Sequence, residues 1–218
     1  MTCAPLHALA LPRSRAATDL SPAGPTTTAP ALLPPQGFAF MLVAAAFATY
    51  AFVPSALSAH LLAIFSRTGI DPATVVVIGA MFGPAQVAAR LVEFTFGRNV
   101  HPLTIARFAV SLLVSAFALL AVFGFSTPVA AIFALMFGVA NGLITIARGA
   151  VPLALFGAAG YGRLVGRIAG PSLIMQAAAP LVLAFLVERI SDPAALAFAA
   201  ALALIALACF AAIRRPAA

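Results

Sequence analysis

The sequence predicts an all-helical membrane protein with six transmembrane helices. Of its 218 residues, 64% are hydrophobic and only 8% are charged, and the mean hydropathy is strongly positive. Water-soluble domains of this size do not have such a composition. Each of six apolar runs has at least the roughly 20 residues that a helix needs to cross the hydrocarbon core. The predicted spans are residues 38–65, 72–96, 103–125, 128–156, 161–187 and 193–213.

The first 36 residues differ from the rest of the chain. They are rich in Pro, Ala and Thr and cannot bury enough apolar surface to fold, so we expect a disordered cytoplasmic tail or linker over 1–36 and a six-span domain over 37–215. A signal peptide is the competing interpretation. It is disfavoured because the apolar stretch before Arg13 is short, is broken by Pro5 and His7, and has no basic region ahead of it.

Arginine placement predicts the orientation, since all twelve basic residues are Arg. One side of the membrane carries Arg13, Arg15, Arg98, Arg107, Arg163, Arg167, Arg214 and Arg215. The other side carries Arg67 and Arg189, which lie near Asp71, Glu188 and Asp192. Both termini are therefore expected to lie in the cytoplasm. The membrane is expected to be the plasma membrane of a bacterium, that is, its inner membrane. This asymmetry accounts for the net charge of +7 and leaves no folded basic face for a nucleic acid.

Motifs for catalysis, metal binding or cofactor binding are missing from the sequence. The two cysteines, Cys3 and Cys209, lie in different environments, and neither a Cys/His cluster nor a glycine-rich phosphate loop is present. An intramembrane protease would need a catalytic pair, for which the spans offer Ser58 and His60. A helix-end histidine with a structural hydrogen bond is the favoured interpretation of His60. We expect no enzyme, no metal and no cofactor.

Polar residues within the spans indicate where function lies, because in lipid they are costly unless they face a cavity or one another. They recur at steps of four and three, which places each set on one helix face. The sets are Tyr50, Pro54 and Ser58; Gln86, Arg90 and Glu93; Asn141, Thr145 and Arg148; and Ser172 and Gln176. The last span has no such set. Spans one, two, four and five are thus predicted to share an aqueous cavity, with a substrate path along Tyr50, Gln86, Asn141, Thr145 and Gln176.

The charged members of these rows have two interpretations. Arg90 and Arg148 lie in the cytoplasmic third of their spans, where each can reach the interface, form ion pairs or act in an inner gate. Alternatively, they contact the substrate directly and favour an anionic solute. We expect Glu93 to be shared between both arginines as a counter-ion that ties spans two and four together. The alternative for Glu93 is a proton carrier.

Glycine and proline show a second regularity. Gly83-Pro84 in span two and Gly170-Pro171 in span five occupy comparable places in spans one to three and spans four to six. Such interruptions at matching positions point to inverted three-helix repeats and a transport site. The alternative is helix packing, because small residues spaced by four let helices approach closely. That spacing holds for Gly162, Gly166 and Gly170, and for Gly138 and Gly142.

The runs AFATYAFVPSALSAHLLAIF, IGAMFGPAQVAARLVEF and GVANGLITIARGAVPLALFGAAGYGRLVGRIAGPSLIMQAAAPL resemble the second half of a major facilitator superfamily transporter. The resemblance covers residues 38–213. It implies six transmembrane helices as two inverted three-helix repeats, cytoplasmic termini, and a cavity bordered by spans one, two, four and five. The family has a cytoplasmic loop motif in which a glycine and an acidic residue are followed by Gly-Arg, and this motif is only partly present. Gly97-Arg98 matches its end, and Glu93 lies near the acidic position, but the spacing differs by one residue. The series from Gly162 to Pro171 is similar to the family's glycine-proline motif, without its later glycine pair.

Length is the main departure from that family, whose cavity needs two six-helix halves. We therefore expect transport of a small organic solute, coupled to protons, by a homodimer or by this chain paired with a separate half. One alternative is a truncated half without transport activity. The other is a six-span permease subunit driven by a separate ATPase, for which the segment 157–163, GAAGYGR, is too short as a coupling loop.

Overall fold

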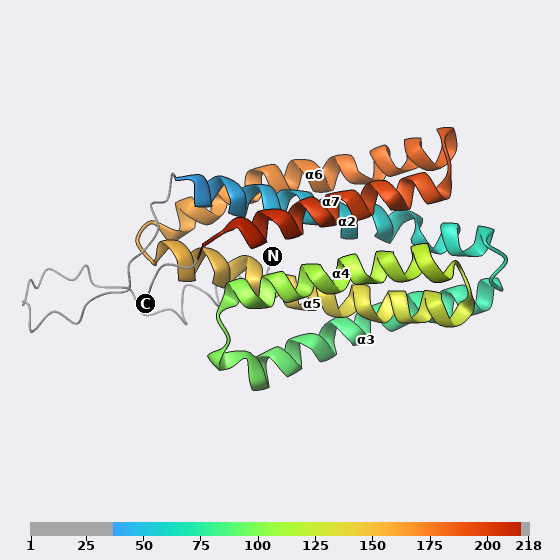
Figure 1. The fold of residues 1–218 in the computed structure, drawn as a ribbon, viewed down its shortest axis with the longest axis horizontal. Coiled ribbons are helices and arrows are strands. Elements are labelled where there is room, and N and C mark those ends of the chain that lie inside the picture. The colour runs from blue at the N-terminus through green and yellow to red at the C-terminus, as the bar shows by residue number, and fades with distance from the viewer. Residues whose placement is uncertain (1–36, 215–218) are drawn as a thin grey trace, which may run out of the picture. The chain divides into compact units, whose positions relative to one another are not determined.

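Residues 37–214 are described by a computed structural model, with the side chain of residue 98 left aside. Within this range the chain forms six long helices, all of them long and apolar enough to cross a membrane, which confirms the predicted all-helical fold of six span-length helices (Figure 1). They are α2 (Phe38–Arg67), α3 (Pro72–Phe96), α4 (Pro102–Phe123), α5 (Thr127–Phe156), α6 (Tyr161–Arg189) and α7 (Asp192–Ala212), with a short 3₁₀ turn, η1 (Gly97–Asn99), after α3. The predicted tail, 1–36, and Arg215 lie outside the described residues.

Helix boundaries follow from local sequence signals. Polar N-cap side chains accept hydrogen bonds from backbone N–H groups two or three residues on: Asp71 at 3.1 Å, His101 at 3.2 Å and Ser191 at 3.3 Å. Proline occupies one of the first two positions of each helix that these residues start, where no N–H is needed. Gly124 and Gly157 end α4 and α5 with φ of 70° and 81°, a conformation that favours glycine.

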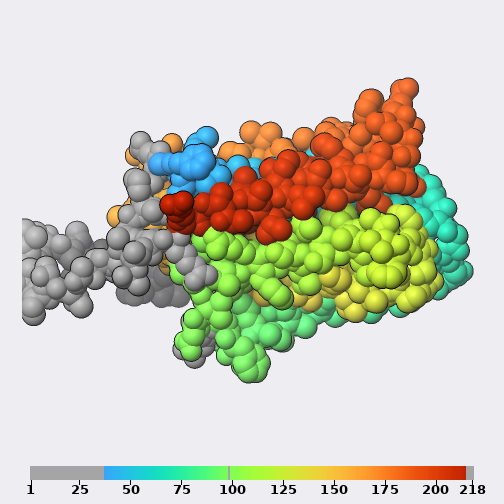
Figure 2. Space-filling view, viewed as in Figure 1, coloured from blue at the N-terminus to red at the C-terminus, as the bar shows by residue number. Residues whose placement is uncertain are grey.

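Two helices form the centre of the bundle. The most buried spans are α2 and α5. Helix α2 packs mainly against α6 and α7, and α5 packs mainly against α3 and α4, while α4 and α7 lie side by side (Figure 1). Side chains of α4 and α7 meet on the face seen in Figure 2. The least buried spans are α3 and α6, which leaves their outer faces available for lipid or another chain.

Helices α3 and α5 touch backbone to backbone at two glycines of α5. A Cβ built on Gly138 would lie 2.7 Å from the carbonyl oxygen of Phe82, and one built on Gly142 would lie 2.5 Å from that of Gln86. Contacts this short leave no room for a side chain. They fix the register of the two helices, so that Asn141 and Gln86 stand at the same level of the bundle.

The register of α2 and α6 is fixed by two hydrogen bonds. Pro180 has no N–H, so the carbonyl of Gln176, four residues earlier, lacks its helical donor. The hydroxyl of Ser55 donates to that carbonyl at 2.8 Å. One turn further along, Nε2 of His60 donates to the carbonyl of Pro180 at 3.1 Å. This structural hydrogen bond agrees with the favoured interpretation of His60, while the hydroxyl of Ser58 donates to the backbone of its own helix.

Both ends of α7 are held by arginines of other helices. Nε of Arg107, on α4, donates to the carbonyl of Phe210 at 2.9 Å, and its Nη2 donates to Ala211 at 3.2 Å and Ile213 at 2.6 Å. These three carbonyls belong to the end of α7, where helical donors run out. At the other end Nε of Arg67 pairs with Asp192 at 3.0 Å and connects α2 to α7.

Candidate substrate path

A polar groove lies between α2, α5 and α6. It has a volume of about 320 Å³ and is lined by Ala51, Pro54, Ser55, Asn141, Thr145, Arg148 and Gln176. Three of the predicted path residues, Asn141, Thr145 and Gln176, therefore meet here with Arg148. They come from α5 and α6, which follow one another in the chain, and Ala51, Pro54 and Ser55 of α2 complete the groove.

The groove offers hydrogen-bond donors that the described residues leave unused. The hydroxyls of Ser55 and Thr145 already donate to backbone carbonyls, the latter at 2.6 Å to the carbonyl of Asn141. The side-chain amides of Asn141 and Gln176 form no hydrogen bond within the described range. The guanidinium of Arg148 has neither a hydrogen bond nor an ion pair there, and its Nε is buried, so its terminal N–H groups are the donors that a ligand can meet. No carboxylate lines the groove. It is thus a concave surface with free amide and guanidinium donors.

An apolar cavity of about 440 Å³ adjoins the polar groove, between α2, α3 and α5. The two share Pro54 and Asn141 as lining residues. Its polar side chains are Ser58, Gln86 and Asn141, and the rest of its wall is formed by aliphatic and aromatic side chains. Gln86 thus reaches the predicted path from α3. The two hollows thus adjoin at Pro54 and Asn141, between α2 and α5.

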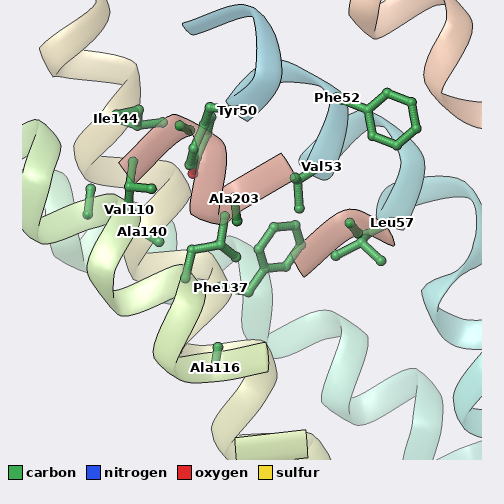
Figure 3. Packing of buried hydrophobic residues seen from close by; sticks show 14 of the residues in the cluster. Tyr50, Phe52, Val53, Leu57, Val110, Ala116, Phe137, Ala140, Ile144 and Ala203 are labelled. Carbon is green, nitrogen blue, oxygen red and sulfur yellow. The ribbon is translucent and has the colours of Figure 1, made fainter. Parts of the chain in front are cut away.

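Tyr50 differs from its predicted place on the path. Its side chain is fully buried among the apolar side chains of the core (Figure 3). It is not among the residues that line either hollow. Five residues separate Tyr50 from Ser55, so on a helix their side chains point about 140° apart. The hydroxyl of Tyr50 has no partner within the described residues, although it interacts electrostatically with Arg148. Tyr50 is therefore a core residue rather than a residue that lines the groove.

The predicted ion pair of Glu93 with Arg90 and Arg148 is not formed. In the described part of the chain the ion pair is that of Arg67 with Asp192. The side chain of Glu93 lies beside Gly97 and lines a separate, largely apolar hollow between α3, α4 and α5. That hollow takes Val139 and Leu143 from α5, whereas the polar groove takes Asn141 and Thr145 from another face of the same helix. Nε of Arg90 is buried without a partner in the same range.

The glycine-proline positions do not interrupt their helices. Helix α3 continues through Gly83-Pro84 and α6 through Gly170-Pro171. A Cβ added to Gly83, Gly162, Gly166 or Gly170 would meet nothing within 4 Å. Close helix packing uses Gly138 and Gly142 instead, which have the same spacing of four. Spacing alone therefore does not tell which glycines pack closely inside the chain, and the predicted packing role of Gly83, Gly162, Gly166 and Gly170 is not seen within the described residues.

The sequence did not single out two residues whose contacts the structure shows. Ser55 lines the groove and bonds to Gln176, and the signal for it is Pro180, which frees one carbonyl four residues before it. Arg107 was counted only as a topology charge, and nothing local to its sequence points to the end of α7.

Comparison with known proteins gives no relative: no protein-family model matches the chain, and a search of curated proteins finds no match. The resemblance to the major facilitator superfamily therefore stays a prediction from the residues.

Proposed function

We propose that the chain is one half of a secondary transporter, of the major facilitator type, that moves a small organic solute. The observation that carries this proposal is the polar groove of Asn141, Thr145, Arg148 and Gln176, which adjoins an apolar cavity within a predominantly apolar helix bundle. Polar and ionisable side chains within a membrane mark solute paths, because their desolvation is otherwise costly. The path runs from Gln86, on α3, through Asn141 to Gln176.

The packing of the helices supports an inverted repeat. Helix α2 packs on α6 and α7, and α5 packs on α3 and α4. Exchanging α2 with α5, α3 with α6, and α4 with α7 turns the first set of contacts into the second. Short connections make successive spans antiparallel, so two units of three helices run in opposite directions through the membrane. Transporters with solute sites at the interface of such repeats are a recurrent architecture.

A second six-helix unit completes the path in this proposal. The groove is open at the surface of the helix bundle. If lipid covered that opening, the guanidinium of Arg148 and the amides of Asn141 and Gln176 would face hydrocarbon, which is unfavourable. The exposed spans α3 and α6 carry large apolar side chains and the open glycines Gly166 and Gly170. A second copy is the simplest partner, since one two-fold contact covers the groove of both copies. A separate six-helix chain is the alternative.

Proton coupling is part of the proposal. Glu93 is a carboxylate within α3 that has no ion pair in the described residues, and it faces a largely apolar hollow. A carboxylate that is not held by a cation can take up and release a proton during a transport cycle. This supports the proton-carrier interpretation of Glu93 over the counter-ion interpretation.

Transport in proteoliposomes tests the proposal. The full chain is reconstituted, a pH gradient is imposed, and uptake is measured for labelled benzenesulfonate, glucose and tetraethylammonium as anionic, neutral and cationic probes. Uptake of at least one probe above protein-free liposomes is expected. Combined Gln86→Ala, Asn141→Ala and Gln176→Ala should abolish it, whereas Arg163→Gln, outside the groove, should not. Uptake that survives the triple change would show that the path is wrong.

A further inference from the structure

We propose that the polar groove and the apolar cavity together form one binding site for an amphipathic organic anion. Its oxyanion head, a carboxylate or sulfonate, binds at Arg148 between Asn141 and Gln176, and its apolar body occupies the adjoining cavity. The proposal deepens the transport function and rests on it for the physiological role. The binding site itself is a property of the chain that is measured separately.

The donor set of the groove selects an anionic head. Arg148 presents a planar guanidinium that binds carboxylate or sulfonate oxygens through two parallel N–H groups. Asn141 and Gln176 add amide N–H donors from α5 and α6, and no described residue occupies them. Ser55 and Thr145 cannot donate without giving up their backbone carbonyls. The amides of Asn141 and Gln176 also carry acceptor oxygens, but Arg148 is a donor only, so a head that accepts hydrogen bonds from all three side chains matches this wall.

Charge balance favours an anion over a neutral or cationic ligand. Arg148 lies within α5 and has no ion pair in the described residues, and the groove has no carboxylate lining it. An unpaired guanidinium in a membrane is unfavourable, and an anionic ligand offsets that cost where a neutral one does not. A cation would be repelled by Arg148.

The adjoining cavity selects an apolar body. Its wall contains Leu57, Leu61, Phe65, Ile78, Phe82 and Phe137. The rings of Phe82 and Phe137 lie 4.9 Å apart between centroids, which gives the cavity an aromatic side. An apolar cavity of about 150 Å³ already holds benzene. The volume of about 440 Å³ therefore accepts one aromatic ring or a short alkyl chain. Because Asn141 lines both hollows, head and body are accommodated at once.

Binding measured by isothermal titration calorimetry tests the site, with the full chain in lipid nanodiscs. Benzenesulfonate has both the anionic head and the ring. Benzenesulfonamide removes the charge and methanesulfonate removes the ring, and each should bind at least about tenfold more weakly. Arg148→Gln should weaken benzenesulfonate binding by about tenfold or more, while Arg163→Gln, an exposed arginine at the start of α6, should change it by less than about twofold.

Arg148→Lys separates charge from geometry and guards against a folding defect, since it keeps the cation but loses the two-pronged donor. It should bind at an intermediate affinity, with an unchanged melting temperature. Equal binding of benzenesulfonamide, equal losses in Arg148→Gln and Arg163→Gln, or no binding of benzenesulfonate would each overturn the anion site. Uptake of glucose or tetraethylammonium without benzenesulfonate binding would leave transport standing and remove this site. Binding without uptake of any probe would support the site and remove the transport proposal.

Discussion

Gly142 is the position at which α3 and α5 approach most closely, and Gly142→Ala should destabilise the bundle. The new Cβ would lie 2.5 Å from the carbonyl oxygen of Gln86 and 3.0 Å from the Cβ of Ala89. Ordinary contact begins near 3.4 Å, and the obstructing oxygen belongs to a helix backbone, so it cannot rotate away. The helices must separate, or the carbonyl must tilt out of its hydrogen bond.

Overpacking of this kind costs about 1–3 kcal/mol in the free energy of unfolding. The higher helix propensity of Ala returns up to about 1 kcal/mol. Gly83→Ala is the matched control, because it adds the same methyl group to α3 where nothing lies within 4 Å. We expect Gly83→Ala to leave stability unchanged or to raise it slightly, and Gly142→Ala to lower it clearly.

The assay is the midpoint of thermal unfolding of purified protein in detergent, read from the fraction that stays monodisperse on size-exclusion chromatography. Gly138→Ala, whose Cβ would lie 2.7 Å from the carbonyl oxygen of Phe82, should behave like Gly142→Ala. If Gly142→Ala and Gly83→Ala melt at the same temperature, the register of α3 on α5 deduced above is wrong.

Three further predictions concern stability, coupling and topology. Arg107→Lys keeps the charge but reaches fewer of the carbonyls at the end of α7, so the free energy of unfolding should fall by about 1–3 kcal/mol, and a melting temperature equal to that of the unchanged chain would contradict this role. Glu93→Gln removes a carboxylate without an ion pair in the described residues, so the amount of folded protein in the membrane should stay normal while the pH dependence of transport is lost; reduced abundance would restore the counter-ion interpretation. Single cysteines at Ser126 and Ser191 should react with an impermeant thiol reagent on intact cells, whereas one at Ala158 should not, and the reverse pattern would overturn the orientation.

The helices could be predicted from the sequence because in lipid every backbone polar group must be satisfied within its own helix. The length and apolar composition of each run therefore determine a span almost by themselves, and the Asp71-Pro72 and Ser191 signals set the starts of α3 and α7 closely. Spacing also placed Asn141, Thr145 and Gln176 on defined helix faces, since the helical period is 3.6 residues, and in the structure the three residues line one groove.

Contacts between helices could not be predicted in the same way. The face of a helix is set by its periodicity, but the neighbour of that face depends on how the whole bundle packs. Glu93 and Arg148 lie at similar depth on neighbouring helices, yet each faces a different hollow. Tyr50 shares the apolar side of α2 with the core rather than with Ser55. Gly166 and Gly142 have the same spacing motif, and the structure uses only Gly142 for close packing in the described chain.

Whether water enters the polar groove is the most direct test of the account. Single cysteines at Thr145 and Gln176 are compared with cysteines at Val77 and Leu181, exposed positions on the outer faces of α3 and α6, in a chain whose Cys3 and Cys209 are replaced. A water-soluble maleimide applied to membranes should label Thr145→Cys and Gln176→Cys, and benzenesulfonate should slow that labelling. Val77→Cys and Leu181→Cys should stay unlabelled in lipid. Labelling confined to the two outer positions, with Thr145→Cys and Gln176→Cys unreactive, would contradict a water-filled solute path.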